Sequence, residues 1–215
     1  MDKKERAIEV VKILKKVYPE AKVALYYKTP FQLLVAVILS AQCTDKRVNL
    51  VTPVLFKKFP TVKDLANCDL NELEKIIYST GFYKNKAKNI KLMANEILKD
   101  FKGDVPDTME DLLKLHGVAR KTANVILTSV FGKNCGIVVD THMIRISGLL
   151  GLADKKDVSK KNAVNIEKTL MKIIPKKDWG DISFLLVNLG RNVCIARRPK
   201  CGICPLNKIC PSAKV

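Results

Sequence analysis

Apolar residues recur along most of the chain at the three- and four-residue spacing of amphipathic helices. The clearest stripes comprise Ala7, Val10, Val11 and Leu14, and later Ile90, Met93, Ala94, Ile97 and Leu98. Strand-like alternation is almost absent, and prolines and glycines separate the helical segments. This pattern predicts about ten short helices joined by tight loops. We therefore expect an all-α protein.

The longest apolar run, residues 31–43, is interrupted by Gln32, Ser40 and Gln42. A membrane span needs about 20 apolar residues, so this run is too short and is typical of a buried helix. The amino-terminal residues lead directly into a helical pattern, without the apolar core of an export signal. The composition is that of a soluble globular protein, and we expect no membrane association.

Basic residues strongly outnumber acidic ones: 39 Lys and Arg face 21 Asp and Glu, a formal net charge of +18. Such a positive field favours an anionic partner, and nucleic acid is the first candidate. The alternative explanation for the excess of basic residues is drift of the amino-acid composition toward lysine, without selection for binding. Against drift alone, no acidic residue follows Asp181, whereas the basic residues that follow it are Arg191, Arg197, Arg198, Lys200, Lys208 and Lys214.

Four cysteines crowd into one short segment near the carboxy-terminal end. Cys194, Cys201, Cys204 and Cys210 form a C-x6-C-x2-C-x5-C run. Thiolates bind zinc or iron-sulfur clusters, and structural zinc sites usually pair two short C-x2-4-C knuckles, of which only one occurs here. The spacing therefore favours a 4Fe-4S cluster over zinc. Two disulfides are a third possibility, which the absence of an export signal disfavours.

A glycine-bearing turn between two helical patterns is the second informative segment. The patterns run from Met109 to Lys114 and from Thr122 to Phe131, with Gly117 between them. Glycine gives a tight turn the backbone freedom it needs, and the amides at the start of the next helix can bind a phosphate oxygen. On its own, this pattern also fits an ordinary corner between two helices.

Several segments together resemble the endonuclease III family of DNA glycosylases over residues 25–210. The hairpin at 115–121 is similar to the family's L-P-G-V-G-x-K, with His116 and Ala119 in place of proline and the second glycine. The other matching segments are Leu39 to Asp45 (L-S-A-Q-x-T-D), Gly81 to Ala87 (G-x-Y-x-x-K-A), Val139 to His142 (V-D-T-H) and the four cysteines.

The resemblance implies that Lys121 and Asp140 carry the catalysis. Lys121 would attack C1′ of the sugar and form a Schiff base, which permits β-elimination of the 3′ phosphate. Asp140 would stabilise the sugar cation as the base leaves. From the residues alone, without the resemblance to the family, Lys121 fits a solvated surface lysine and Asp140 fits the N-cap of a helix.

The resemblance also implies a DNA-binding surface. Base removal needs the nucleotide to leave the stack, and Gln42 and Phe82 match the residues that fill the gap. Without the family, Gln42 fits a helix-end cap and Phe82 a core contact. Phosphate contacts are expected from the hairpin residues and the loop between the first two cysteines: His116, Gly117, Val118, Ala119, Arg120, Arg197, Arg198 and Lys200.

Three cysteines lie outside the motif, at Cys43, Cys68 and Cys135, and their apolar neighbours predict small core residues. His142 follows Asp140 closely and fits a residue that holds that loop.

We expect two lobes: residues 22–133 as a helical barrel with the helix-hairpin-helix, and residues 1–21 with 134–215 around the cluster. DNA would lie between the lobes, where Lys121 and Asp140 meet at the target sugar. The expected function is base-excision repair of double-stranded DNA: removal of an oxidised pyrimidine, then cleavage of the abasic site. A monofunctional glycosylase for mispaired thymine or adenine is the nearer alternative, and a non-catalytic DNA-binding module the more distant one. We expect a monomer in the cytoplasm of a prokaryote, associated with the nucleoid.

Overall fold

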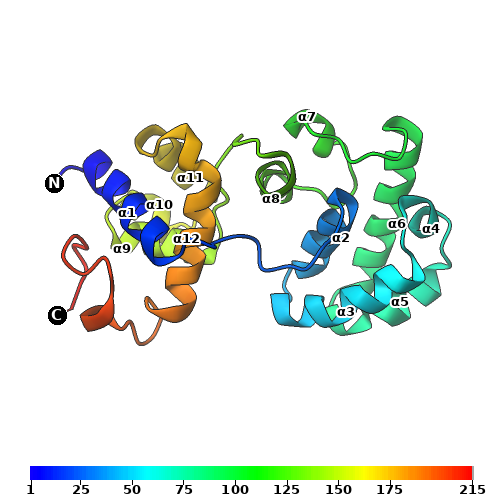
Figure 1. The fold of residues 1–215 in the computed structure, drawn as a ribbon, viewed down its shortest axis with the longest axis horizontal. Helices are drawn as coiled ribbons and strands as arrows, with labels where there is room; N and C mark the ends of the chain where they lie inside the picture. Colours follow the sequence, from blue (N-terminus) through cyan, green and yellow to red (C-terminus); the bar gives the residue numbers. More distant parts are fainter. Residues whose placement is uncertain (215) are drawn as a thin grey trace. The chain divides into compact units, whose positions relative to one another are not determined.

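The computed structural model describes residues 1–214, and all regular secondary structure in that range is helical (Figure 1). The α-helices are α1 (Lys3–Val17), α2 (Pro30–Ser40), α3 (Asp45–Lys58), α4 (Val62–Ala66), α5 (Leu70–Ile77), α6 (Tyr83–Asp100), α7 (Met109–Leu112), α8 (Arg120–Phe131), α9 (Thr141–Leu149), α10 (Lys155–Ser159), α11 (Ala163–Ile173) and α12 (Trp179–Asn192). Short 3-10 segments are η1 (Tyr78–Thr80), η2 (Lys176–Asp178) and η3 (Cys201–Ile203). The predicted all-α class is confirmed.

The chain folds as two compact units. The helical lobe contains Ala24–Gly132. The cysteine lobe combines Met1–Val23 with the segment from Lys133 onward, so the first helix of the chain belongs with the last.

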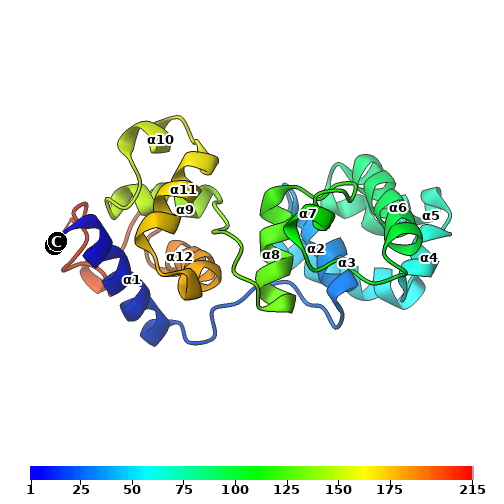
Figure 2. The same cartoon turned by 90° about the horizontal axis from the view of Figure 1, so that it is seen from above.

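The helical lobe is built around α2. Seven of its eleven residues are buried, because the apolar run leaves no polar face: Phe31, Leu33, Leu34, Val35, Ala36, Ile38 and Leu39. This helix contacts α3, α6 and α8, and Figure 2 shows α8 and α3 beside it. The long helix α6 packs against α4, α5 and η1. The predicted buried helix within residues 31–43 is therefore present.

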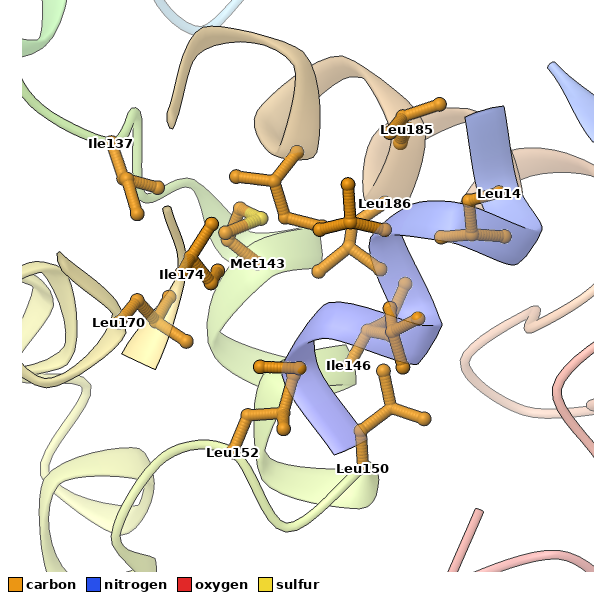
Figure 3. Packing of buried hydrophobic residues seen from close by; sticks show 14 of the residues in the cluster. Leu14, Ile137, Met143, Ile146, Leu150, Leu152, Leu170, Ile174, Leu185 and Leu186 are labelled. Carbon is orange, nitrogen blue, oxygen red and sulfur yellow. The ribbon is translucent and has the colours of Figure 1, made fainter. Parts of the chain in front are cut away.

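The core of the cysteine lobe joins α1 to helices that lie far along the sequence. The apolar stripe of α1, from Ala7 to Leu14, is fully buried, and α1 contacts α11 and α12. Figure 3 shows Leu14 beside Leu186 of α12, with Ile146 of α9 and Leu150, the residue after α9, nearby. Several buried leucines and isoleucines pack together here, each stabilising the fold by about 1.5–3 kcal/mol.

Polar side chains mark where many of the helices begin. Asp2 and Glu5 form a reciprocal capping box at α1. The hydroxyl of Thr29 accepts from the Gln32 amide and precedes Pro30, the first residue of α2. The hydroxyl of Thr44 accepts from the Arg47 amide and caps α3 in the same way.

Residues 1–214 form twelve α-helices, in line with the predicted number of about ten. Two sequence predictions need correction. Helix α8 begins at Arg120 rather than Thr122, so Lys121 lies inside its first turn. Among the cysteines outside the motif, Cys68 is buried as predicted, but Cys43 is only partly buried and Cys135 is exposed. Apolar neighbours in sequence do not decide which way a short loop residue faces.

No helix among residues 1–214 is both long enough and apolar enough to span a membrane.

Candidate functional site

The turn between α7 and α8 has the geometry of a helix-hairpin-helix. Gly117 has a φ of +77°, in the left-handed region that strains any side chain. A Cβ added to Gly117 would also lie 3.1 Å from Cβ of Asn89 on α6. Leu115 and Val118 are buried on either side of it. The turn therefore needs glycine both for its backbone and for its close approach to α6.

Glu96 of α6 holds His116, the residue that stands where the family usually has proline. The His116 amide donates to Oε2 of Glu96 at 2.8 Å. Nδ1 of the imidazole contacts Oε1 of the same carboxylate. One carboxylate thus fixes both the backbone and the side chain of His116, which supplies a constraint that a proline ring would otherwise supply.

Lys121 is exposed in the first turn of α8. Within residues 1–214 its amine has no hydrogen-bond or ion-pair partner. Ala119, the N-cap, has φ −94° and ψ 167°, an extended backbone that any residue adopts. No side chain caps α8, and the first amides of a helix have no intrahelical acceptor. The start of α8 therefore offers amides to an anion and a free amine beside them.

Asp140 is the N-cap of α9, and its Oδ1 accepts from the Met143 amide at 2.8 Å. Its side chain is partly buried, and its other carboxylate oxygen has no partner among the described residues. The amide of Val138 donates to Oγ of buried Ser183 on α12 at 3.0 Å, which fixes the segment before Asp140. Asp140 is thus both a helix cap, as the sequence allowed, and a carboxylate with one oxygen available.

His142 packs between α9 and α12. A Cβ on Gly190 of α12 would lie 2.5 Å from its Nδ1, so glycine is needed where the helices touch. The buried Nδ1 of His142 has no hydrogen-bond partner in the described part of the chain. The contact fits the expected role of His142 in holding the loop at Asp140.

Gln42 and Phe82 share an unusual backbone. Gln42 has φ +54° and Phe82 φ +50°, both left-handed, which is uncommon for residues other than glycine. Both are exposed, Phe82 to 63%. The core interpretation of Phe82 is therefore wrong. Nor is Gln42 a helix-end cap, since the C-cap of α2 is Ala41. Strained, exposed residues of this kind cluster at binding sites.

The four motif cysteines line one cavity of about 280 Å³ in the cysteine lobe. All are free thiols and partly buried. Burial raises the pKa of the Cys204 and Cys210 thiols, and the neighbouring thiols raise it further. Bound metal relieves this cost, because it neutralises the thiolates that it coordinates. Four soft donors that line one cavity of this size therefore fit a cluster of several iron and sulfur atoms.

Helix α9 connects the cysteine cavity to Asp140. Nη1 of Arg145 on α9 donates to Sγ of Cys194 at 3.5 Å. Sγ of Cys210 lies 3.7 Å from the carbonyl oxygen of Leu149, the last residue of α9. The helix that Asp140 caps thus contacts Cys194 at its middle and Cys210 at its far end. Within residues 1–214, no three His, Cys, Asp or Glu side chains converge on a single metal ion.

The loop between the first two cysteines exposes Arg197, Arg198 and Lys200. None of these side chains has an ion-pair partner in the described part of the chain. The two ends of the loop are joined by the Lys200 amide, which donates to the Val193 carbonyl at 3.0 Å. A firmly attached loop with unpaired cations suits a phosphate backbone.

Sequence reasoning missed Glu96, Arg145 and the role of Lys86. Lys86 was noted only as part of a motif, although it shares the buried face of α6 with Ala87 and Ile90. A lysine in register with an apolar stripe is a signal that could have singled it out. Glu96 gave no such signal, because its partner His116 lies 20 residues away.

Comparison with known proteins agrees with this geometry. Residues 35–176 match the family described as HhH-GPD superfamily base excision DNA repair protein, and residues 194–210 match the iron-sulfur binding domain of endonuclease III. The sequence is 53% identical over 212 residues to endonuclease III of Synechocystis sp., covering 99% of this chain and 94% of that protein. Endonuclease III of Bacillus subtilis is 45% identical over 193 residues, or 90% and 86% of the two chains.

Solved structures give the same result. A trapped endonuclease III–DNA covalent intermediate, an estranged-adenine complex, matches with a TM-score of 0.90 and 41% identity, covering 99% of this chain and 98% of that one. A thermostable thymine-DNA glycosylase matches with a TM-score of 0.85 but only 20% identity, which shows a shared fold.

Proposed function

Because the chain belongs to the endonuclease III family, we propose that it removes oxidised pyrimidines from duplex DNA and then cleaves the strand at the abasic site. The general activity, a DNA glycosylase with abasic-site lyase action, is that of the family. The lesion class and the residue roles are our proposal. The observation that carries it is the exposed, unpartnered amine of Lys121 at the start of the helix after the hairpin.

Lys121 is the proposed nucleophile. Its neutral amine attacks C1′ as the bond from C1′ to the base breaks, and the base leaves with a proton. The nitrogen then gives up one proton, the ring oxygen O4′ gains one as the C1′–O4′ bond breaks, and the product is a protonated Schiff base between Lys121 and C1′. The imine acidifies the C2′ hydrogen, whose loss expels the phosphate from C3′. Water finally hydrolyses the imine and frees Lys121.

Asp140 is the proposed electrostatic partner of this reaction. Its Oδ1 is used by the Met143 amide, which fixes the orientation of the carboxylate. The other oxygen can face positive charge that develops on the sugar as the base leaves. A preoriented carboxylate needs no reorganisation at that moment, so the charge acts mainly in the transition state.

Two surfaces are proposed to bind phosphates by different means. The hairpin offers backbone amides at the start of α8, which require close approach and hence Gly117. The loop of Arg197, Arg198 and Lys200 offers exposed positive charge, which attracts phosphates at longer range. Cys194, Cys201, Cys204 and Cys210 would hold the 4Fe-4S cluster, which would fix both ends of this loop when bound. Gln42 and Phe82 are proposed to fill the gap left by the extruded nucleotide.

The two alternatives explain less of the molecule. A non-catalytic module would use the hairpin and the loop but would have no use for a free amine at Lys121. Monofunctional relatives that excise mispaired thymine or adenine lack the hairpin lysine. We also propose a monomer, since one chain carries the hairpin, the amine, the carboxylate and the cysteines. Because its named relatives are bacterial, we place it at the nucleoid in a prokaryotic cytoplasm.

Borohydride trapping tests the proposal, because it reduces a transient imine to a permanent crosslink. Duplexes would each carry one change: an oxidised pyrimidine, a mispaired thymine, a mispaired adenine or none. We expect a crosslink and strand cleavage on the oxidised pyrimidine alone. Excision of a mispaired base without a crosslink would instead identify the monofunctional alternative, and binding without excision the non-catalytic one.

A further inference from the structure

Lys86 is one of the few charged side chains in the core of the helical lobe. It lies on α6 and is only 5% exposed. Its ammonium donates to the carbonyl oxygens of Leu39 and Thr80, each at 2.8 Å. Within residues 1–214 it forms no ion pair with a carboxylate. The ammonium is therefore held by backbone carbonyls alone.

The two carbonyls belong to the two segments that carry Gln42 and Phe82. Leu39 lies three residues before Gln42, near the end of α2, and Thr80 lies two residues before Phe82, in η1. Lys86 also donates its own amide to the Phe82 carbonyl at 3.1 Å. One side chain thus ties together two segments that are about forty residues apart in sequence.

Both segments need an external constraint. Gln42 and Phe82 hold left-handed backbones, and such conformations cost of order 1–3 kcal/mol each unless the surroundings fix them. Burying an ammonium also carries a cost, and burial lowers the pKa of Lys86, with nearby Cys43 opposing the shift. A methionine would avoid that cost but would leave two buried carbonyls without a donor.

We propose that Lys86 is a positioning residue that sets the segments of Gln42 and Phe82 in register, so that both side chains enter the DNA stack together. This inference rests on the proposed gap-filling role of Gln42 and Phe82. Lys86 itself touches neither DNA nor the reacting sugar in this scheme. Its effect on base excision passes through the two exposed side chains.

A double-mutant cycle tests the proposal. Single-turnover excision would be measured for Lys86→Met, for the Gln42→Ala/Phe82→Ala variant and for the combined triple variant. Active enzyme is counted by borohydride trapping on a preformed abasic duplex, so misfolded protein does not enter the rates. We expect Lys86→Met to slow excision about tenfold in the wild-type background, since small misplacements have large effects. In the Gln42→Ala/Phe82→Ala background it should slow excision less than about twofold, because coupled residues are not additive.

Lys91→Met is the matched control. Lys91 lies on the same helix and donates to a backbone carbonyl, that of Cys68, at 2.7 Å, away from both turns. The Lys91→Met variant should excise the damaged base at the wild-type rate. If Lys86→Met does not fold, Lys86→Gln takes its place; its amide reaches at most one carbonyl, and a smaller but equally non-additive loss is expected.

The outcomes separate this inference from the proposed function. Normal excision by Gln42→Ala/Phe82→Ala would remove the gap-filling role, whatever Lys86 does. Slow excision by that variant, with the same tenfold loss when Lys86→Met is added, would leave gap filling in place and make Lys86 merely structural. Wild-type rates for Lys86→Met would also overturn the positioning role.

Discussion

Helices α6 and α8 begin in similar ways, and each uses a lysine near its start for a different purpose. Each follows a turn with a glycine at positive φ, Gly81 before α6 and Gly117 before α8. Near the start of α6, Lys86 is buried and both its acceptors are carbonyl oxygens. At the start of α8, Lys121 is exposed and its amine has no partner among the described residues.

The difference lies in what surrounds each ammonium, since both residues are lysines in the first turn or so of a helix. A buried amine that donates to two carbonyls is committed to the fold, because its removal orphans both acceptors. An exposed amine without a partner can form a bond to a substrate without disrupting any contact of the fold. Burial and hydrogen bonding therefore separate a scaffold lysine from a candidate nucleophile.

Replacing Lys121 with glutamine should have the largest effect on activity. We expect the variant to lose borohydride trapping and strand cleavage, because no other described feature of α8 supplies a free amine at this place. Affinity for the lesion duplex should stay within about threefold of wild type, since the hairpin amides and the cationic loop are unchanged. Stability should not change, because glutamine is a good helix former at an exposed site. Retained trapping would show that another amine is the nucleophile.

Asp140→Asn tests whether base excision needs the negative charge of Asp140 in addition to the amine of Lys121. Asparagine is as good an N-cap as aspartate, so the bond from the Met143 amide and the start of α9 should survive. Only the charge is removed. We expect base excision to fall about 10²-fold or more if the charge acts on the transition state.

The loss should be smaller on a preformed abasic site, where the bond to the base is already broken. Single-turnover rates on the two substrates measure the difference. An equal loss on both, with unchanged thermal unfolding, would assign Asp140 to a proton transfer shared by both steps.

The turn before α8 can be tested separately from its lysine. Gly117→Val places a β-branched residue at positive φ and drives its Cβ against Asn89. We expect the hairpin to move and affinity for every duplex to fall about tenfold, whatever lesion it carries. Gly132→Val is the matched control, because Gly132 also has positive φ, at the other end of α8, but an added Cβ meets nothing within 4 Å.

Both variants should lose similar stability from backbone strain, and only Gly117→Val should lose affinity. Fluorescence anisotropy and denaturant unfolding measure the two effects. Equal affinity for the two variants would mean that the hairpin is only a structural corner.

The sequence predicted one side of this comparison better than the other. Lys121 and Asp140 stand in short motifs, and helical periodicity placed the apolar stripes of α1 and α6 on buried faces. The roles of Lys86 and Glu96 could not be read from sequence, because their contacts join residues 47 and 20 positions apart. The boundary of α8 was wrong by two residues because Ala119 and Arg120 carry no start signal that periodicity detects.

The smallest effect is expected on stability, at a third lysine, Lys15. Lys15 of α1 contacts Asp178 at 2.6 Å and Asp181 at 2.7 Å. Burial works against its protonation, but the hydrogen bonds and charges of both aspartates outweigh it, so the pKa of Lys15 is raised. Burial lowers the pKa of Lys86, whose acceptors are neutral carbonyls. The two lysines should therefore change stability in opposite directions as pH rises.

The raised pKa of Lys15 contributes stability that is fully present below its unfolded pKa of 10.5 and is lost as pH rises through the folded value. Lys86 binds its proton more weakly in the folded state, so its unfavourable contribution diminishes as pH approaches 10.5. Urea unfolding at pH 8 to 11 would compare wild type with Lys15→Met and with Lys86→Met. Since Lys15 is 42% exposed, we expect Lys15→Met to cost about 0.2–1 kcal/mol at pH 8 and less above pH 10.5. The cost of Lys86→Met should instead grow as pH rises toward 10.5. Parallel curves for the two variants would contradict the distinction between carboxylate-bound and carbonyl-bound lysines.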